Sequence, residues 1–230
     1  MAAKSFSVIF VLTLSVGTTS LGWANDENSD AAIAQADKAL KADSKDAKAY
    51  YNRGTAYYNQ GNFDTAVRDL SQAIALEPKA PDAYFNRGLS LRRQHKIDES
   101  ISDFTQAITL CRTQPGYYFE RGNALIVKGY YENAIKDCSE VIRLSPNEPE
   151  GYFLRGLAFM FNGDLVKALA DSMRAVQIDP DYANARRLLG ETLMKIKVSQ
   201  TPFFSVPSAQ PVLERKNISS VSRDFRRESE

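Results

Sequence analysis

Residues 50–67 read YYNRGTAYYNQGNFDTAV, and the Arg53-Gly54 pair inside this stretch decides the fold. The pair returns three more times at a constant spacing of 34 residues, as Arg87-Gly88, Arg121-Gly122 and Arg155-Gly156. A fixed period of about 34 residues is typical of arrays of helix–turn–helix units, because one such unit cannot bury its apolar face without a neighbour. The stretch therefore predicts a repeat protein.

Aligned on this period, the four units begin at residues 47, 81, 115 and 149, and each has the pattern of two helices. Large apolar residues at places 4 and 11 of the unit and glycine at place 8 share one face of a first helix. Glycine inside a helix costs about 1 kcal/mol relative to alanine, so we expect another backbone to come close there. A turn near place 15 leads to a second helix with small residues at places 20 and 27, and proline ends that helix in three units.

These positions resemble the tetratricopeptide repeat. The match covers residues 47–182 as four complete units, 47–80, 81–114, 115–148 and 149–182. The resemblance implies an all-α fold, in which antiparallel helix pairs stack into a right-handed superhelical solenoid with a concave peptide-binding face. The second unit departs from the pattern, because Arg112 stands where its terminal proline is expected.

Two flanking segments extend the predicted stack. Residues 25–46 fit the second half of a preceding repeat, and residues 183–198 fit the first helix of a fifth, with Leu189-Gly190 at places 7 and 8. The polar side chains Arg186, Arg187, Glu191 and Lys195 suit a final capping helix, which no neighbour covers. The proline-, serine- and charge-rich residues 199–230 predict a disordered tail.

The first 24 residues have the pattern of a secretory signal peptide. Lys4 gives a positive start, an apolar run covers residues 6–16, and the segment ends in the small residue Ala24. The apolar run is shorter than the roughly 20 residues that a membrane-spanning helix needs. We therefore expect a periplasmic or secreted protein with no integral membrane span after cleavage; an uncleaved anchor is the alternative.

The arginine at place 7 replaces the leucine that is usual in the family, so it needs a partner. An aspartate recurs at place 23, nearly level with place 7 in an antiparallel helix pair. We predict four two-pronged ion pairs that join the helices of each unit. These are Arg53–Asp69, Arg87–Asp103, Arg121–Asp137 and Arg155–Asp171. We interpret them as structural; a functional track of charges is the alternative.

The resemblance also implies that places 2, 5, 9, 12 and 13 of the first helices line the concave face. The candidates for a peptide-binding groove are Tyr51, Thr55, Phe85, Leu89, Arg92, Arg93, Phe119, Asn123, Phe153 and Leu157. This groove would be polar and basic at its start and apolar at its end, and an exposed apolar strip marks a contact surface. The alternative is that the aromatic residues at place 5 belong to the core between helices.

Composition narrows the function further. Without Lys4 the chain has as many basic as acidic residues, whereas a nucleic-acid binder normally has a basic excess. The sequence shows no catalytic constellation, metal-ligand cluster or cofactor motif, and its one histidine, His95, stands at a turn. We predict a non-enzymatic scaffold or adaptor that binds an extended apolar segment of another protein. The alternative is a self-associating structural component whose groove holds its own tail, residues 201–213.

Overall fold

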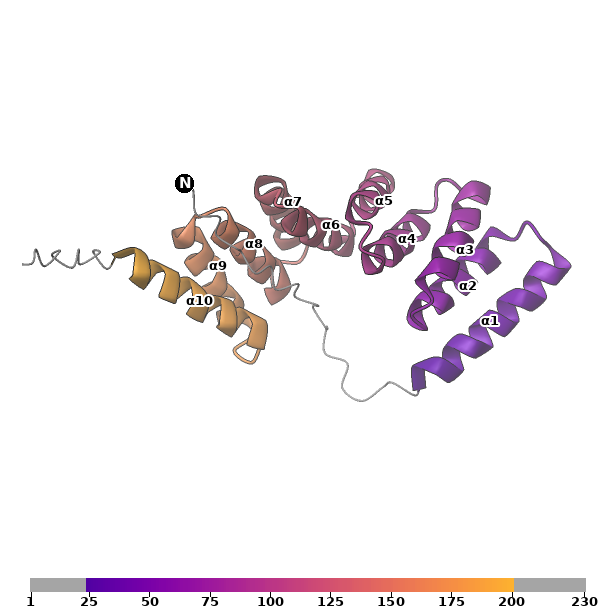
Figure 1. Cartoon of the computed structure of the whole chain (residues 1–230), viewed down its shortest axis with the longest axis horizontal. Coiled ribbons are helices and arrows are strands. Elements are labelled where there is room, and N and C mark those ends of the chain that lie inside the picture. Colours follow the sequence, from indigo (N-terminus) through magenta and orange to yellow (C-terminus); the bar gives the residue numbers. More distant parts are fainter. Residues whose placement is uncertain (1–23, 201–230) are drawn as a thin grey trace, which may run out of the picture.

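The computed structural model describes residues 24–200, which form ten α-helices in one curved row (Figure 1). The helices are α1 (Ala24–Ala42), α2 (Ala47–Asn59), α3 (Phe63–Leu76), α4 (Pro81–Arg93), α5 (Ile97–Leu110), α6 (Pro115–Lys128), α7 (Tyr131–Leu144), α8 (Pro149–Phe161), α9 (Leu165–Ile178) and α10 (Ala183–Gln200). The predicted signal peptide, apart from Ala24, and residues 201–230 of the predicted tail lie outside the described residues. Residues 199 and 200, assigned to that tail, instead continue α10.

Local chemistry explains where the helices begin and end. Proline occupies the first turn of α4, α6 and α8, where its missing N–H costs nothing. Asp46 caps α2 by accepting a hydrogen bond from the backbone N–H of Ala49. Gly61, Gly129 and Gly163 adopt the left-handed backbone at the turn between helices, and His95 adopts it in the second unit. His95 is therefore a turn residue.

The helices pair in sequence, and the pairing defines an inner and an outer side. Each helix packs on its neighbours in the chain, and the first helices of adjacent repeats (α2, α4, α6 and α8, followed by α10) also contact one another. Within residues 24–200, the second helices α3, α5, α7 and α9 make no such contacts. The first helices therefore lie on the inner side of the curve. The predicted all-α array of antiparallel helix pairs is confirmed.

The glycine at place 8 marks the close approach that the sequence predicted. A Cβ atom on Gly88 would lie 2.7 Å from Cε1 of Phe104, and one on Gly54 would lie 2.8 Å from Cγ of Leu70. Phe104 and Leu70 are fully buried, so neither side chain has free space into which to withdraw. Only glycine lets the two helices of these repeats approach so closely.

Each arginine at place 7 joins three helices. Its Nε and Nη2 atoms donate to both carboxylate oxygens of the aspartate 16 residues later, at 2.7–2.9 Å in all four units. Its Nη1 atom donates to a side-chain oxygen 16 residues earlier, at 2.6–3.2 Å. That oxygen belongs to the second helix of the preceding repeat or, for Arg53, to α1. The partners of Nη1 are Asp37, Ser71, Thr105 and Ser139. We call this arrangement the arginine clasp.

Removing one partner of the arginine clasp should destabilise the protein, because it leaves a partly buried charge unpaired. Asp103→Asn would leave the partly buried Arg87 without its counter-charge, and we expect the free energy of unfolding to fall by about 2–3 kcal/mol. Asp98→Asn is the matched control on the same helix, because its partner Lys128 and its own carboxylate, 76% exposed, lie in solvent. The control should lose no more than about 1 kcal/mol. Urea unfolding measures both values, and equal losses would contradict a special role for the clasp.

Candidate functional site

The inner face of the first three repeats is the accessible part of the predicted groove. Six of the ten candidates are partly exposed on α2, α4 and α6, and a seventh, Arg93, is exposed. The partly exposed six are Tyr51, Thr55, Phe85, Leu89, Arg92 and Phe119. Together they place hydroxyl, aromatic, aliphatic and guanidinium groups along one side of the stack.

The predicted apolar end of the groove is closed, which corrects the expectation for three residues. Phe153, Leu157 and Asn123 are only 1%, 7% and 9% exposed. The ring of Phe153 packs edge-on against Tyr182, with 5.5 Å between centroids, and Leu157 shares a core cluster with Leu188 of α10. Tyr182 and α10 therefore enclose Phe153 and Leu157 in the core, and none of the three side chains offers an open binding surface.

Phe85 is intermediate between these two cases. Its ring centroid lies 4.9 Å from that of Tyr117 and 5.7 Å from that of Phe104. It therefore contributes to the core between the second and third repeats while one part of it still faces solvent.

Side-chain hydrogen bonds connect neighbouring first helices across the inner face. Asn86 donates through Nδ2 to the hydroxyl of Tyr51 at 3.2 Å and to that of Thr55 at 3.0 Å. Between the next two helices, the hydroxyl of Tyr117 donates to the carboxylate of Asp82. Burial raises the pKa of both tyrosines, and Asp82 adds to the effect. The hydroxyls therefore stay protonated, and these contacts fix the spacing of α2, α4 and α6.

An ion pair between Arg92 and Glu120 joins α4 to α6. Nη2 of Arg92 lies 2.9 Å from Oε2 of Glu120, and burial raises the pKa of Glu120 despite the guanidinium. Three side-chain atoms here are buried without a hydrogen-bond partner: Nε of Arg92, Oε2 of Glu120 and Oε1 of Gln94. A buried polar group without a partner costs about 1–3 kcal/mol.

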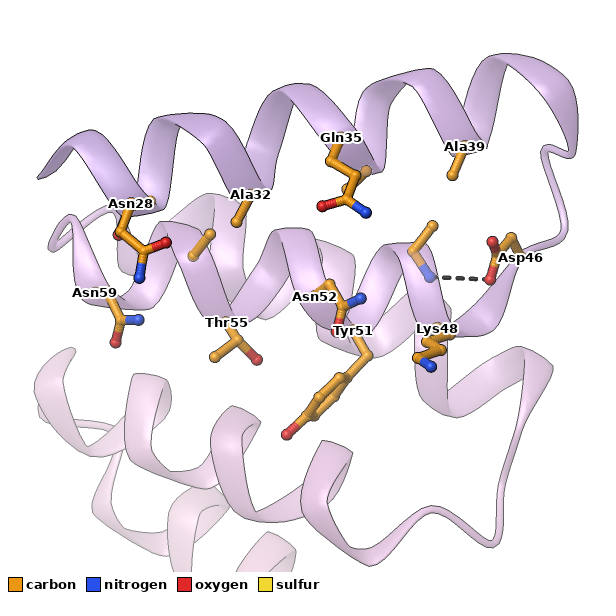
Figure 2. A pocket seen from close by; sticks show the side chains of 14 residues that line it. Asn28, Ala32, Gln35, Ala39, Asp46, Lys48, Tyr51, Asn52, Thr55 and Asn59 are labelled. Carbon is orange, nitrogen blue, oxygen red and sulfur yellow. Dashed lines mark hydrogen bonds between the residues drawn. The ribbon is translucent and has the colours of Figure 1, made fainter. Parts of the chain in front are cut away.

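A cavity of about 410 Å³ opens at the start of the same face, between α1 and α2 (Figure 2). Its floor contains alanines, among them Ala32, Ala36 and Ala39 of α1. Its rim carries four amide side chains, those of Asn28, Gln35, Asn52 and Asn59, together with Lys48 and the groove candidates Tyr51 and Thr55. The sequence did not reveal this cavity, because alanines at helical spacing predict packing rather than an opening.

The chemistry of the inner face is that of recognition. Its amides and hydroxyls can donate and accept hydrogen bonds. Arg92 and Arg93 are cationic, and Leu89 and Phe119 offer apolar surface to a ligand. Residues 24–200 contain no cluster of three or more His, Cys, Asp or Glu residues suited to a metal ion. In the same range, none of the helices combines the length and the apolar character that crossing a membrane requires.

Comparison with known proteins identifies the family. The family model of the tetratricopeptide repeat matches residues 24–63, 51–118 and 119–183. The chain therefore belongs to the tetratricopeptide repeat family. No curated protein sequence matches it.

Solved structures show the same fold at low sequence identity. MamA is similar with a TM-score of 0.65 and 22% identity, over 70% of this chain and 94% of MamA. YrrB, described as a TPR protein with an unusual peptide-binding site, has a TM-score of 0.64 and 22% identity, over 71% of this chain and 84% of YrrB. TTC0263, a thermophilic TPR protein of Thermus thermophilus, has a TM-score of 0.55 and 18% identity, over 73% of this chain and 92% of TTC0263. These likenesses concern the fold.

Proposed function

We propose that this protein is a non-enzymatic scaffold that binds an extended segment of a partner protein on the inner face of its first three repeats. The observation that carries the proposal is the row of partly exposed apolar, hydroxyl and guanidinium side chains that α2, α4 and α6 present on that face. The family assignment supports it, and YrrB, which shares the fold, is described as having a peptide-binding site.

The chemistry of the face defines the segment that fits. An extended chain presents unpaired backbone N–H and C=O groups along its length, and the exposed amides Asn52 and Asn59 can pair with either kind. Leu89 and Phe119 favour apolar side chains. The cationic side chains of Arg92 and Arg93 favour an acidic group or a carbonyl oxygen. The partner segment is therefore apolar with an acidic or carbonyl acceptor near its middle, and it binds the first three repeats rather than the fourth.

Leu89→Ser should weaken peptide binding about tenfold or more, because the loss of a contact from a buried leucine is worth about 1.5–3 kcal/mol. The probes are ten-residue peptides selected by phage display on the full chain and then synthesised, with affinity measured by fluorescence polarisation. Leu76→Ser is the control, because Leu76 is 39% exposed on the second helix α3, away from the inner face.

The control should bind the peptides as tightly as the unchanged protein. Equal affinity in all three proteins, or a loss caused by Leu76→Ser alone, would contradict the proposed site.

We propose further that the protein acts in the periplasm or is secreted. The support is the sequence of residues 1–24, which has the charge, apolar run and small final residue of a signal peptide. Sequencing the N-terminus of the protein purified from its native cells should find Asn25 as the first residue. An N-terminus at Met1 or Ala2 would contradict export by this route.

A further inference from the structure

The two ends of the described stack are each half of a repeat. The helix α1 occupies the place of a second helix, since Asp37 enters the arginine clasp of Arg53 as Ser71 enters that of Arg87. Similarly, α10 occupies the place of a first helix, since it packs on α9 and on α8. Within residues 24–200, α1 lacks the first helix of its own repeat and α10 lacks the second helix of its own repeat.

The cavity beside α1 is the space that the missing first helix would fill. Ala32, Gln35 and Ala36 line it, and the residues 34 positions later are Ala66, Asp69 and Leu70. Those three residues hold the first helix α2 at close range, because a Cβ on Gly54 would lie 2.8–3.2 Å from their atoms. The corresponding residues of α1 face an open cavity instead (Figure 2).

The open face of α10 carries the matching feature. Gly190 follows Gly156 by 34 residues. A Cβ on Gly156 would lie 3.3 Å from the carbonyl oxygen of Ala168 and 3.3 Å from Cβ of Asp171, whereas one on Gly190 would meet nothing within 4 Å. On the same helix Leu193 is 49% exposed. Thus α10 has glycine at the position where other first helices contact the second helix of their own repeat, but within residues 24–200 no such helix lies against Gly190.

The departures of α1 and α10 from the repeat pattern are also compatible with each other. Leu189 stands where the other first helices carry the clasp arginine, and Gln35 stands where the other second helices carry the clasp aspartate. Bringing α10 against α1 would therefore bury neither an unpaired arginine nor an unpaired aspartate. The sequence of α10 has four basic residues and one acidic, whereas that of α1 has four acidic and two basic. The two helices therefore carry net charges of opposite sign, which favours their association.

We propose that α10 of one copy docks between α1 and α2 of a second copy and completes a hybrid repeat. The contact is heterologous, so each copy keeps one free end and further copies add in the same direction. The inner face would then continue from copy to copy, and several peptide sites would lie along one assembly. This inference goes beyond peptide binding by a single chain and does not depend on it.

Gly190→Gln tests the proposal directly. The added side chain has free space in the single chain, and it would collide with the backbone of α1 in the hybrid repeat. Gly116→Gln is the matched control, because a Cβ on Gly116 also meets nothing within 4 Å and the residue lies in α6, away from both ends. Circular dichroism should show unchanged helix content in both variants.

Sedimentation velocity of the full-length proteins over a range of concentrations measures assembly. The average mass of the unchanged protein and of Gly116→Gln should rise with concentration to several times that of one chain, while Gly190→Gln should remain a single chain. The proposal is overturned if the unchanged protein stays a single chain throughout, as it would if residues 201–230 covered α10. It is also overturned if Gly190→Gln assembles like the control. The peptide assay with Leu89→Ser is independent of either result.

Discussion

The rest of the structure depends on the arginine clasp. A guanidinium group has a planar fork that matches a carboxylate with two hydrogen bonds and still has a donor to spare. Here the fork grips the aspartate of its own repeat, and the spare donor reaches the preceding second helix, as in the contacts of Arg87 with Asp103 and Ser71. A lysine, with one compact charge, cannot make this three-helix contact. The clasp therefore fixes both the pairing within a repeat and the register between repeats.

The glycine that follows each clasp arginine allows the two helices of the repeat to lie close enough for the clasp to form. Because Gly88 has no side chain, Phe104 of the second helix can lie against the backbone of the first, and the aspartate beside it comes within reach of the arginine. The net stability from a desolvated ion pair is modest, and its orientation is specific. This combination explains why the chain repeats arginine and glycine together.

Several features of the fold and site were predictable from the sequence because they repeat. The period located the helices, and the glycines located the close contacts. Arginines 16 residues before aspartates indicated the pairs within each repeat. The third partner of the clasp was not predicted, because Asp37, Ser71, Thr105 and Ser139 share only an oxygen atom on a short side chain. Hydroxyls on helices are common, so their recurrence gave little signal.

The extent of the groove was harder to predict for a different physical reason. Helical spacing tells which face a residue occupies, but it does not tell how far the next helix covers that face. Phe153 and Leu157 occupy the inner face as the pattern predicts and are nevertheless buried, because Tyr182 and α10 pack over them. The cavity at α1 lies where, among residues 24–200, no first helix precedes α1, and an absent neighbour leaves no pattern in the residues that line the space.

The central claim is that paired helices form an open stack in which each repeat contacts only the repeats next to it. Small-angle X-ray scattering of residues 24–200, extrapolated to infinite dilution, tests this most directly. A compact domain of this length would have a radius of gyration of about 16 Å. The open stack predicts a clearly larger value and an elongated distribution of interatomic distances. A value near that of the compact domain, with a symmetric distribution, would contradict the account.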